Sequence, residues 1–141
     1  MNRRTFLATG AVAGVAGLSG CLAVFNDAGR NSEDYDVGMA DSAYEPAEVT
    51  VAVGDTVVWK NTSGRAHTVT AYDSGVPEGA EYFASGGFED EGAARDAWKR
   101  GAGGIVSGET YEHTFETPGE YAYVCIPHER QAMTGTVVVE Q

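Results

Sequence analysis

Short runs rich in valine, threonine, tyrosine and tryptophan recur from residue 36 to the end of the chain, separated by polar turn residues. Several runs alternate apolar and polar positions, as strands with one buried face do. No helix–strand alternation and no internal repeat is visible, so about seven strands predict an antiparallel sandwich or barrel. The predicted strands are residues 49–53, 56–60, 67–71, 109–115, 121–125 and 135–139, with an edge strand at 36–39.

Residues 72–108 interrupt the regular spacing of the predicted strands with a long, glycine-rich connection. Within it, residues 90–100 predict a short helix, because acidic side chains stand at its start and basic ones at its end, as the helix dipole favours. Connections this long in compact domains are usually functional or disordered. We expect the insertion to pack on the sandwich and to shape a partner surface, through its apolar residues Pro77, Tyr82, Phe83 and Phe88.

The first twenty residues have the features of an export signal. Arg3 and Arg4 precede a short run of small and apolar residues. This run is shorter than the ~20 residues that a membrane-spanning helix needs, and a basic start before small residues is typical of a secretory signal. The paired arginines resemble the twin-arginine class, which exports folded proteins.

A cysteine follows the predicted signal directly. The sequence Leu18-Ser19-Gly20-Cys21 resembles a lipobox, which directs lipid onto the cysteine that becomes the new N-terminus. The alternative is an ordinary cleavage site beside an incidental cysteine. Two acyl chains are enough for stable anchoring, and the polar stretch that follows reads as flexible. We predict a twin-arginine-type lipoprotein signal peptide at 1–20, a flexible tether lipidated at Cys21 over 21–35, and one domain at 36–141.

The chain is strongly acidic, with 21 Asp and Glu against 9 Lys and Arg and a formal net charge of −12. Nucleic-acid binding needs clustered Lys and Arg, so this composition argues against a nucleic-acid partner. An acidic surface keeps a protein soluble where salt screens its self-repulsion. A cationic partner is the other explanation for the charge.

The strongest chemical signal lies in residues 125–133, which carry a thiol, an imidazole and a thioether on one loop between two predicted strands. These groups belong to Cys125, His128 and Met133, and His67 opens another predicted strand upstream. Alone, each has a plainer explanation as a strand or core residue. Together they make the set of two histidines, a cysteine and a weak axial methionine that forms a blue-copper site. The soft sulfur donors stabilise Cu(I) and the imidazoles also accept Cu(II), which suits one-electron transfer.

The spacing Cys-x2-His-x4-Met with an upstream histidine resembles the copper loop of plastocyanins and pseudoazurins. The acidic composition, the predicted export signal and the lipobox are similar to those of the halocyanins, small blue-copper proteins of extreme halophiles. The resemblance covers about residues 37–140. The resemblance implies a cupredoxin-like Greek-key β-sandwich of seven to eight strands with a short helix in a long insertion. It also implies one type 1 copper, single-electron transfer rather than catalysis, and an electron path through a surface-facing His128.

Position 68 departs from the family pattern. Plastocyanins commonly carry there an asparagine that hydrogen-bonds the cysteine loop, whereas this chain has Thr68. A threonine hydroxyl can make part of such a contact but reaches less far than an amide, so we do not expect the inherited contact to be kept in full. His113 alternates along a predicted strand without a partner motif, and we expect it on the surface.

Residue counts disfavour other functions. Three histidines cannot supply the further metals of a copper oxidase or nitrite reductase, and a binuclear copper centre needs a second nearby cysteine. A hydrolase would need an acid and an oxyanion site beside Cys125 and His128. A zinc site is disfavoured because thioether is a poor zinc ligand. A copper-delivery or copper-storage lipoprotein remains the alternative, although the chain lacks the Met-rich ligation that it would use.

These features predict a monomeric single-electron carrier with one type 1 copper bound by His67, Cys125, His128 and Met133. We expect lipid on Cys21 to hold it at the cell membrane, on the extracytoplasmic face. Its expected partners are redox proteins, membrane complexes among them, that act as electron donor and acceptor.

Overall fold

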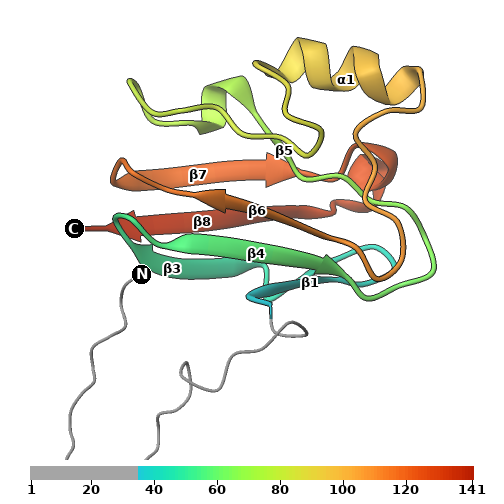
Figure 1. Ribbon diagram of the computed structural model, residues 1–141, viewed down its shortest axis with the longest axis horizontal. Helices are drawn as coiled ribbons and strands as arrows, with labels where there is room; N and C mark the ends of the chain where they lie inside the picture. The colour runs from blue at the N-terminus through green and yellow to red at the C-terminus, as the bar shows by residue number, and fades with distance from the viewer. Residues whose placement is uncertain (1–34) are drawn as a thin grey trace, which may run out of the picture. The chain divides into compact units, whose positions relative to one another are not determined.

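The computed structural model describes residues 35–141; the predicted signal, Cys21 and the tether up to residue 34 lie outside this range. Two four-stranded sheets, with strand orders β2-β1-β4-β6 and β3-β8-β7-β5, enclose one core (Figure 1). The predicted all-β sandwich of seven to eight strands is confirmed. The strands are β1 Val37–Met39, β2 Tyr44–Glu45, β3 Glu48–Ala52, β4 Thr56–Asn61, β5 Thr70–Ala71, β6 Thr110–Thr114, β7 Gly119–Val124 and β8 Thr134–Glu140.

Strand pairing differs from the antiparallel arrangement predicted from the sequence. β1 runs parallel to β4, and β3 runs parallel to β8. Nor is 36–39 an edge, because β1 is buried between β2 and β4. The strand expected at 67–71 shortens to β5, and His67 instead forms an isolated bridge with Ile105. Side-chain alternation determines the face that a residue occupies, but not the strand that lies beside it.

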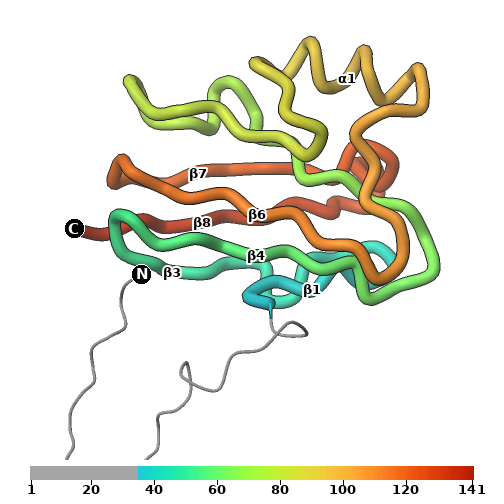
Figure 2. The backbone as a smooth tube through the Cα atoms, in the orientation of Figure 1, coloured from blue at the N-terminus to red at the C-terminus, as the bar shows by residue number. Residues whose placement is uncertain are grey.

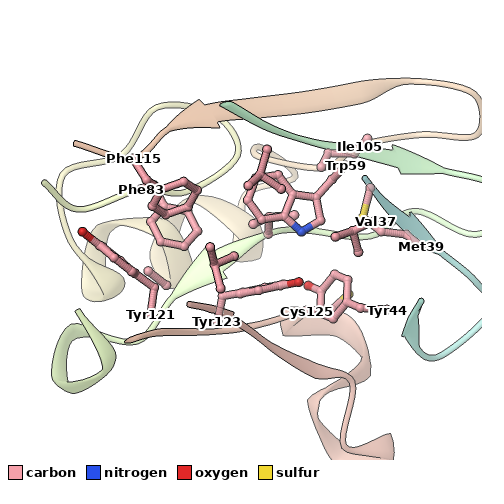
Figure 3. Close-up of a cluster of buried hydrophobic side chains, with 14 of the residues drawn as sticks. Val37, Met39, Tyr44, Trp59, Phe83, Ile105, Phe115, Tyr121, Tyr123 and Cys125 are labelled. Atoms are coloured by element: carbon pink, nitrogen blue, oxygen red, sulfur yellow. The ribbon is translucent and has the colours of Figure 1, made fainter. Parts of the chain in front are cut away.

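The core is built around the Trp59 ring, which projects from β4 between the sheets (Figure 3). Its centroid lies 5.4 Å from that of Tyr123 and 6.0 Å from that of Phe83. Tyr123 on β7 faces Gly135 on β8, and its ring fills the space that a side chain at position 135 would need. Buried aromatic side chains of this kind remove about 150–250 Å² of surface each from water, and so contribute strongly to the stability of the core.

The insertion at 72–108 belongs to the core. It contains a short 3₁₀ segment, η3 (Asp73–Gly75), and one helix, α1 (Glu91–Lys99). In Figure 2 the chain leaves β5, runs above β7 and returns through α1 to β6. Phe83 and Ile105 are buried with the sandwich residues, so the expected packing is confirmed. A short turn could not replace this segment without opening the core.

The helix forms where its charges predict it, within one residue at each end. The Asp90 side chain accepts a hydrogen bond from the Ala93 N–H at 2.7 Å and begins α1, and Arg100 ends it. Such a cap satisfies a backbone donor that has no partner inside the helix. Ala94 and Ala97 form its buried face.

His113 on β6 is half-buried, which corrects the expected surface position. Its ring stacks on Phe83 with centroids 5.0 Å apart and meets Phe115 edge-on at 4.7 Å. Burial lowers the pKa of His113, and the nearby Glu81 and Glu116 partly offset this effect. His113 pairs with the fully buried Val57 of β4 and so lies on the inner face of its strand, where Phe83 of the insertion packs against it.

Candidate metal centre

The loop between β7 and β8 holds three of the predicted ligands in a closed backbone arrangement. Val124 pairs with Thr134 at the loop end of this hairpin, so Cys125 and Met133 meet next. The Cys125 N–H donates to the Met133 carbonyl at 3.0 Å, and the His128 N–H to the Cys125 carbonyl at 3.1 Å. The Met133 N–H in turn donates to the His128 carbonyl at 3.3 Å. The three residues thus fix one another through their own main chains.

Between them the chain forms the 3₁₀ segment η4 (Ile126–Gln131), with Pro127 in its first turn. Proline suits this place because it has no N–H to leave unpaired. The segment ends at Ala132, whose φ of 63° is left-handed. That unusual conformation turns the chain so that Met133 points back into the protein, where it is fully buried.

His67 reaches the same place from the segment before β5. Its backbone makes two hydrogen bonds to Ile105, of 3.1 and 2.7 Å. Its Nε2 lies 2.9 Å from the Ser63 hydroxyl, which leaves Nδ1 facing Cys125 Sγ at 3.5 Å. The ring is therefore held at both nitrogens, and Nδ1 is the one directed at the thiol.

Three donor atoms converge at this point. His128 Nδ1 lies 3.4 Å from Cys125 Sγ, and the ligand atoms of His67, Cys125 and His128 all lie within 4.8 Å of one another. No other cluster of three or more such donors occurs within residues 35–141. Donor atoms at this separation can share one ion at metal–ligand distances of about 2.0–2.3 Å. Two imidazoles, a thiol and a nearby thioether suit copper better than Mg²⁺ or Ca²⁺, which prefer oxygen.

The site is dry, and this changes the protonation of its groups. Burial raises the pKa of the Cys125 thiol to about 11. Burial, reinforced by the neighbouring His128, lowers the pKa of His67 to about 4. At neutral pH the metal-free site therefore holds a neutral thiol and a neutral His67 imidazole. A metal ion that binds must displace the thiol proton, while the imidazole is ready to coordinate.

Sequence comparison identifies the family to which this site belongs. The model for copper-binding proteins of the plastocyanin/azurin family matches residues 32–140. The chain is a member of this family. Its relatives carry electrons and are not enzymes. The resident metal of the site is thus copper, and the predicted cupredoxin resemblance is confirmed.

Individual relatives agree with this assignment. A chloroplast plastocyanin of Tetradesmus obliquus is 33% identical over 128 residues, which cover 91% of this chain and 78% of the relative. A halocyanin of Natronomonas pharaonis is 36% identical over 99 residues, 70% of this chain and 48% of the halocyanin. Among solved structures, a reduced amicyanin variant is 30% identical with a TM-score of 0.55, covering 82% of this chain and 90% of amicyanin.

Thr68 makes with its hydroxyl the kind of contact to the copper loop that its shorter side chain was expected to make only in part. Its hydroxyl accepts a hydrogen bond from the Ile126 N–H at 2.9 Å, and its own N–H points at Cys125 Sγ at 3.4 Å. The Thr70 hydroxyl donates to the Thr68 hydroxyl at 3.0 Å and orients it. The link to the cysteine loop that plastocyanins make with an amide is therefore made here by a hydroxyl.

A buried asparagine that our sequence analysis missed supports the His67 side of this cupredoxin site. Asn61 donates through Nδ2 to the carbonyls of Arg65 and Ile105, at 2.6 and 2.7 Å. Its Oδ1 accepts from the Ser63 N–H and hydroxyl, both at 2.9 Å. Asn61 thus fixes the turn that carries Ser63 and also Ile105, whose backbone pairs with that of His67. The Asn-x-Ser turn chemistry at 61–63 was the available sequence signal.

The insertion also reaches the copper loop through an ion pair that our sequence analysis missed. Arg95 on α1 donates to both carboxylate oxygens of Glu129, at 2.9 and 3.2 Å, and to Glu91 at 2.9 Å. The Tyr72 hydroxyl adds a hydrogen bond to Glu129 at 3.2 Å. The hydrogen bond from Arg95 holds the pKa of Glu129 below its usual value. Since Glu129 follows His128 directly, this contact connects α1 to a predicted copper ligand.

Proposed function

We propose that the protein is a single-electron carrier that shuttles electrons between membrane redox partners on the outer face of the cytoplasmic membrane. Copper would be held by His67, Cys125, His128 and Met133 and would supply a one-electron couple. The observation that carries this proposal is the convergence of both imidazole Nδ1 atoms on the Cys125 thiol, at 3.4 and 3.5 Å, inside the core.

The protein's own contribution is to keep the ligands from moving. Backbone hydrogen bonds join the three loop ligands to one another, and Ile105 holds His67 on the other side. Little rearrangement is then possible when the charge at the site changes by one, and electron exchange is correspondingly fast. His128 is 6% exposed whereas the other three residues are 0% exposed, so electrons would pass through its ring.

Burial of the ligands argues against copper delivery or storage. A delivery protein has to pass its ion to a partner, which needs ligands that the partner can replace one at a time. Here Cys125 and Met133 are completely enclosed by the sandwich and by η4. Exchange of the ion would require opening of the loop, whereas exchange of an electron requires only approach to His128.

The membrane part of the proposal rests on the leader. A signal peptide at 1–20 and lipid on Cys21 would tether the domain through residues 21–35. Within residues 35–141, none of the helices has the length and apolar character required to cross a bilayer. The acidic surface, with its net charge of −12, would favour partners with a cationic docking face.

The two cysteines provide matched variants that test the two halves of the proposal. Cys125→Ser should abolish the intense visible absorption of the copper-loaded protein and leave it attached to washed membranes. Cys21→Ala should keep the colour and release the protein into the soluble fraction. A coloured Cys125→Ser variant would exclude the copper assignment, and a membrane-bound Cys21→Ala variant would exclude the lipid anchor.

A further inference from the structure

His128 has a charged neighbour at its second ring nitrogen. Its Nδ1 faces Cys125 Sγ, and its Nε2 lies 3.4 Å from Nη1 of Arg65. Arg65 is exposed and belongs to the turn that precedes His67. A guanidinium therefore stands directly beside the ring through which electrons would enter and leave.

The two histidines of the site differ at this second nitrogen. When Nδ1 of a neutral imidazole binds a metal, the proton is on Nε2, and that N–H nearly always has an acceptor. The Nε2 of His67 faces the Ser63 hydroxyl at 2.9 Å, which can accept. The Nε2 of His128 faces Arg65, which has only donors. With copper bound, two N–H groups would thus lie side by side with no acceptor between them.

The carboxylates of this part of the protein do not supply the missing hydrogen-bond acceptor. Glu129 is engaged by Arg95 and Tyr72. Within the described chain Arg65 makes no ion pair with a carboxylate. The two donors are therefore available to a group from outside.

We propose that Arg65 and the Nε2–H of His128 together bind a carboxylate of the redox partner at the point of electron transfer. This inference rests on the proposed function. A carboxylate presents two oxygens and forms charge-assisted hydrogen bonds with such donors. One oxygen on each donor would place the partner's carboxylate against the ring that leads to the metal.

The charge of the chain limits what this contact can do. A partner that is acidic over its whole face would be repelled by a surface of net charge −12. The fitting partner surface is cationic around its edge with a single carboxylate at the centre. The Arg65–His128 pair would then orient the partner, while the acidic surface attracts it.

Direct binding can be measured on the Cu(I)-loaded protein with acetate as the probe. The proton resonance of the His128 Nε2–H group should shift with added acetate and not with chloride at equal ionic strength. Arg65→Gln should abolish the shift. Arg130→Gln, which removes an exposed arginine of the copper loop with equal loss of charge, should retain it. No acetate shift in the native protein, or equal shifts in both variants, would overturn the proposal.

Electron-transfer kinetics give a second readout with small redox reagents. Oxidation by anionic hexacyanoferrate(III) should be about two- to fivefold slower in Arg65→Gln than in Arg130→Gln. Oxidation by the cationic tris(phenanthroline)cobalt(III) should not be slower. Equal oxidation rates in the two variants would mean that only the net charge matters, which would contradict the proposal. If the native protein never becomes coloured with copper, the proposed function is also wrong. If it is coloured and reactive but the two variants do not differ in acetate shift or oxidation rate, only the carboxylate site is wrong.

Discussion

The Thr68 hydroxyl accepts the Ile126 N–H at 2.9 Å and thereby joins the His67 segment to the residue that follows Cys125. These residues are separated by 58 positions in the sequence. The backbone N–H of Thr68 approaches Cys125 Sγ at 3.4 Å in the same place. One residue therefore holds both sides of the copper site together, through its side chain and its main chain.

Thr68→Val should destabilise the protein without abolishing its colour. The substitution keeps the shape of the side chain but removes the acceptor, so the Ile126 N–H loses its partner at a cost of about 1–2 kcal/mol. The backbone contact to Cys125 Sγ remains. Urea unfolding of the copper-free and copper-loaded forms measures the loss. Thr68→Ser, which retains the hydroxyl, should stay close to the native stability; equal stability of native protein and Thr68→Val would contradict this role.

Met133→Leu should raise the reduction potential and preserve copper binding. Loss of a weak axial electron donor destabilises Cu(II) more than Cu(I), because Cu(II) carries the higher charge, while His67, Cys125 and His128 still hold the ion. A rise of about 59 mV would be a tenfold change in the one-electron equilibrium and is readily measured by redox titration. Met39→Leu alters the other fully buried methionine of the sandwich and should leave the potential unchanged. Loss of copper from Met133→Leu would mean that Met133 is not a weak axial ligand.

Arg95→Gln should loosen the contact between α1 and the copper loop. Both partners are partly exposed, with side-chain exposures of 29% and 40%, so the expected loss of unfolding free energy is only about 0.5–1 kcal/mol. Glu129→Gln should cost a similar amount, and the double variant little more than either. A double-mutant cycle by urea unfolding measures this coupling. Arg100→Gln, at the exposed end of the same helix, should show no coupling with Glu129; additive losses for Arg95 and Glu129 would exclude the link.

His113 should make the protein less stable in weak acid. Its folded pKa is lowered by burial, so below the unfolded value of 6.5 the unfolded chain binds more protons than the folded one. Its contribution is fully present above pH 6.5 and is lost as the pH falls toward the folded pKa. The slope cannot exceed about 1.4 kcal/mol per pH unit, the value for one proton.

His113→Phe should flatten this part of the stability profile and keep the stacking on Phe83. His113→Gln should flatten it equally but lower stability at every pH, because the aromatic contact is lost. Urea unfolding from pH 7 to pH 5 compares the three proteins. An unchanged slope in both variants would assign the acid sensitivity to other groups.

The sequence by itself determined the helix and predicted a common site for the loop ligands. Cys125, His128 and Met133 are brought together by one short loop, so their spacing alone indicates a common site. The helix at Glu91–Lys99 was predictable for the same reason, since its cap and its charges act within a few residues. The sandwich followed from strand alternation, which is also a local property.

Only the tertiary structure decided how distant segments meet. Parallel pairing of β1 with β4 and of β3 with β8 depends on which strand lies alongside, and alternation carries no such information. The reach of Thr68 to Ile126 depends on how closely two loops approach, not on the length of the side chain. Likewise, Arg65 meets His128 because separate turns fold onto the same end of the sandwich. These contacts depend on packing over long sequence separations, where no local pattern specifies the partner.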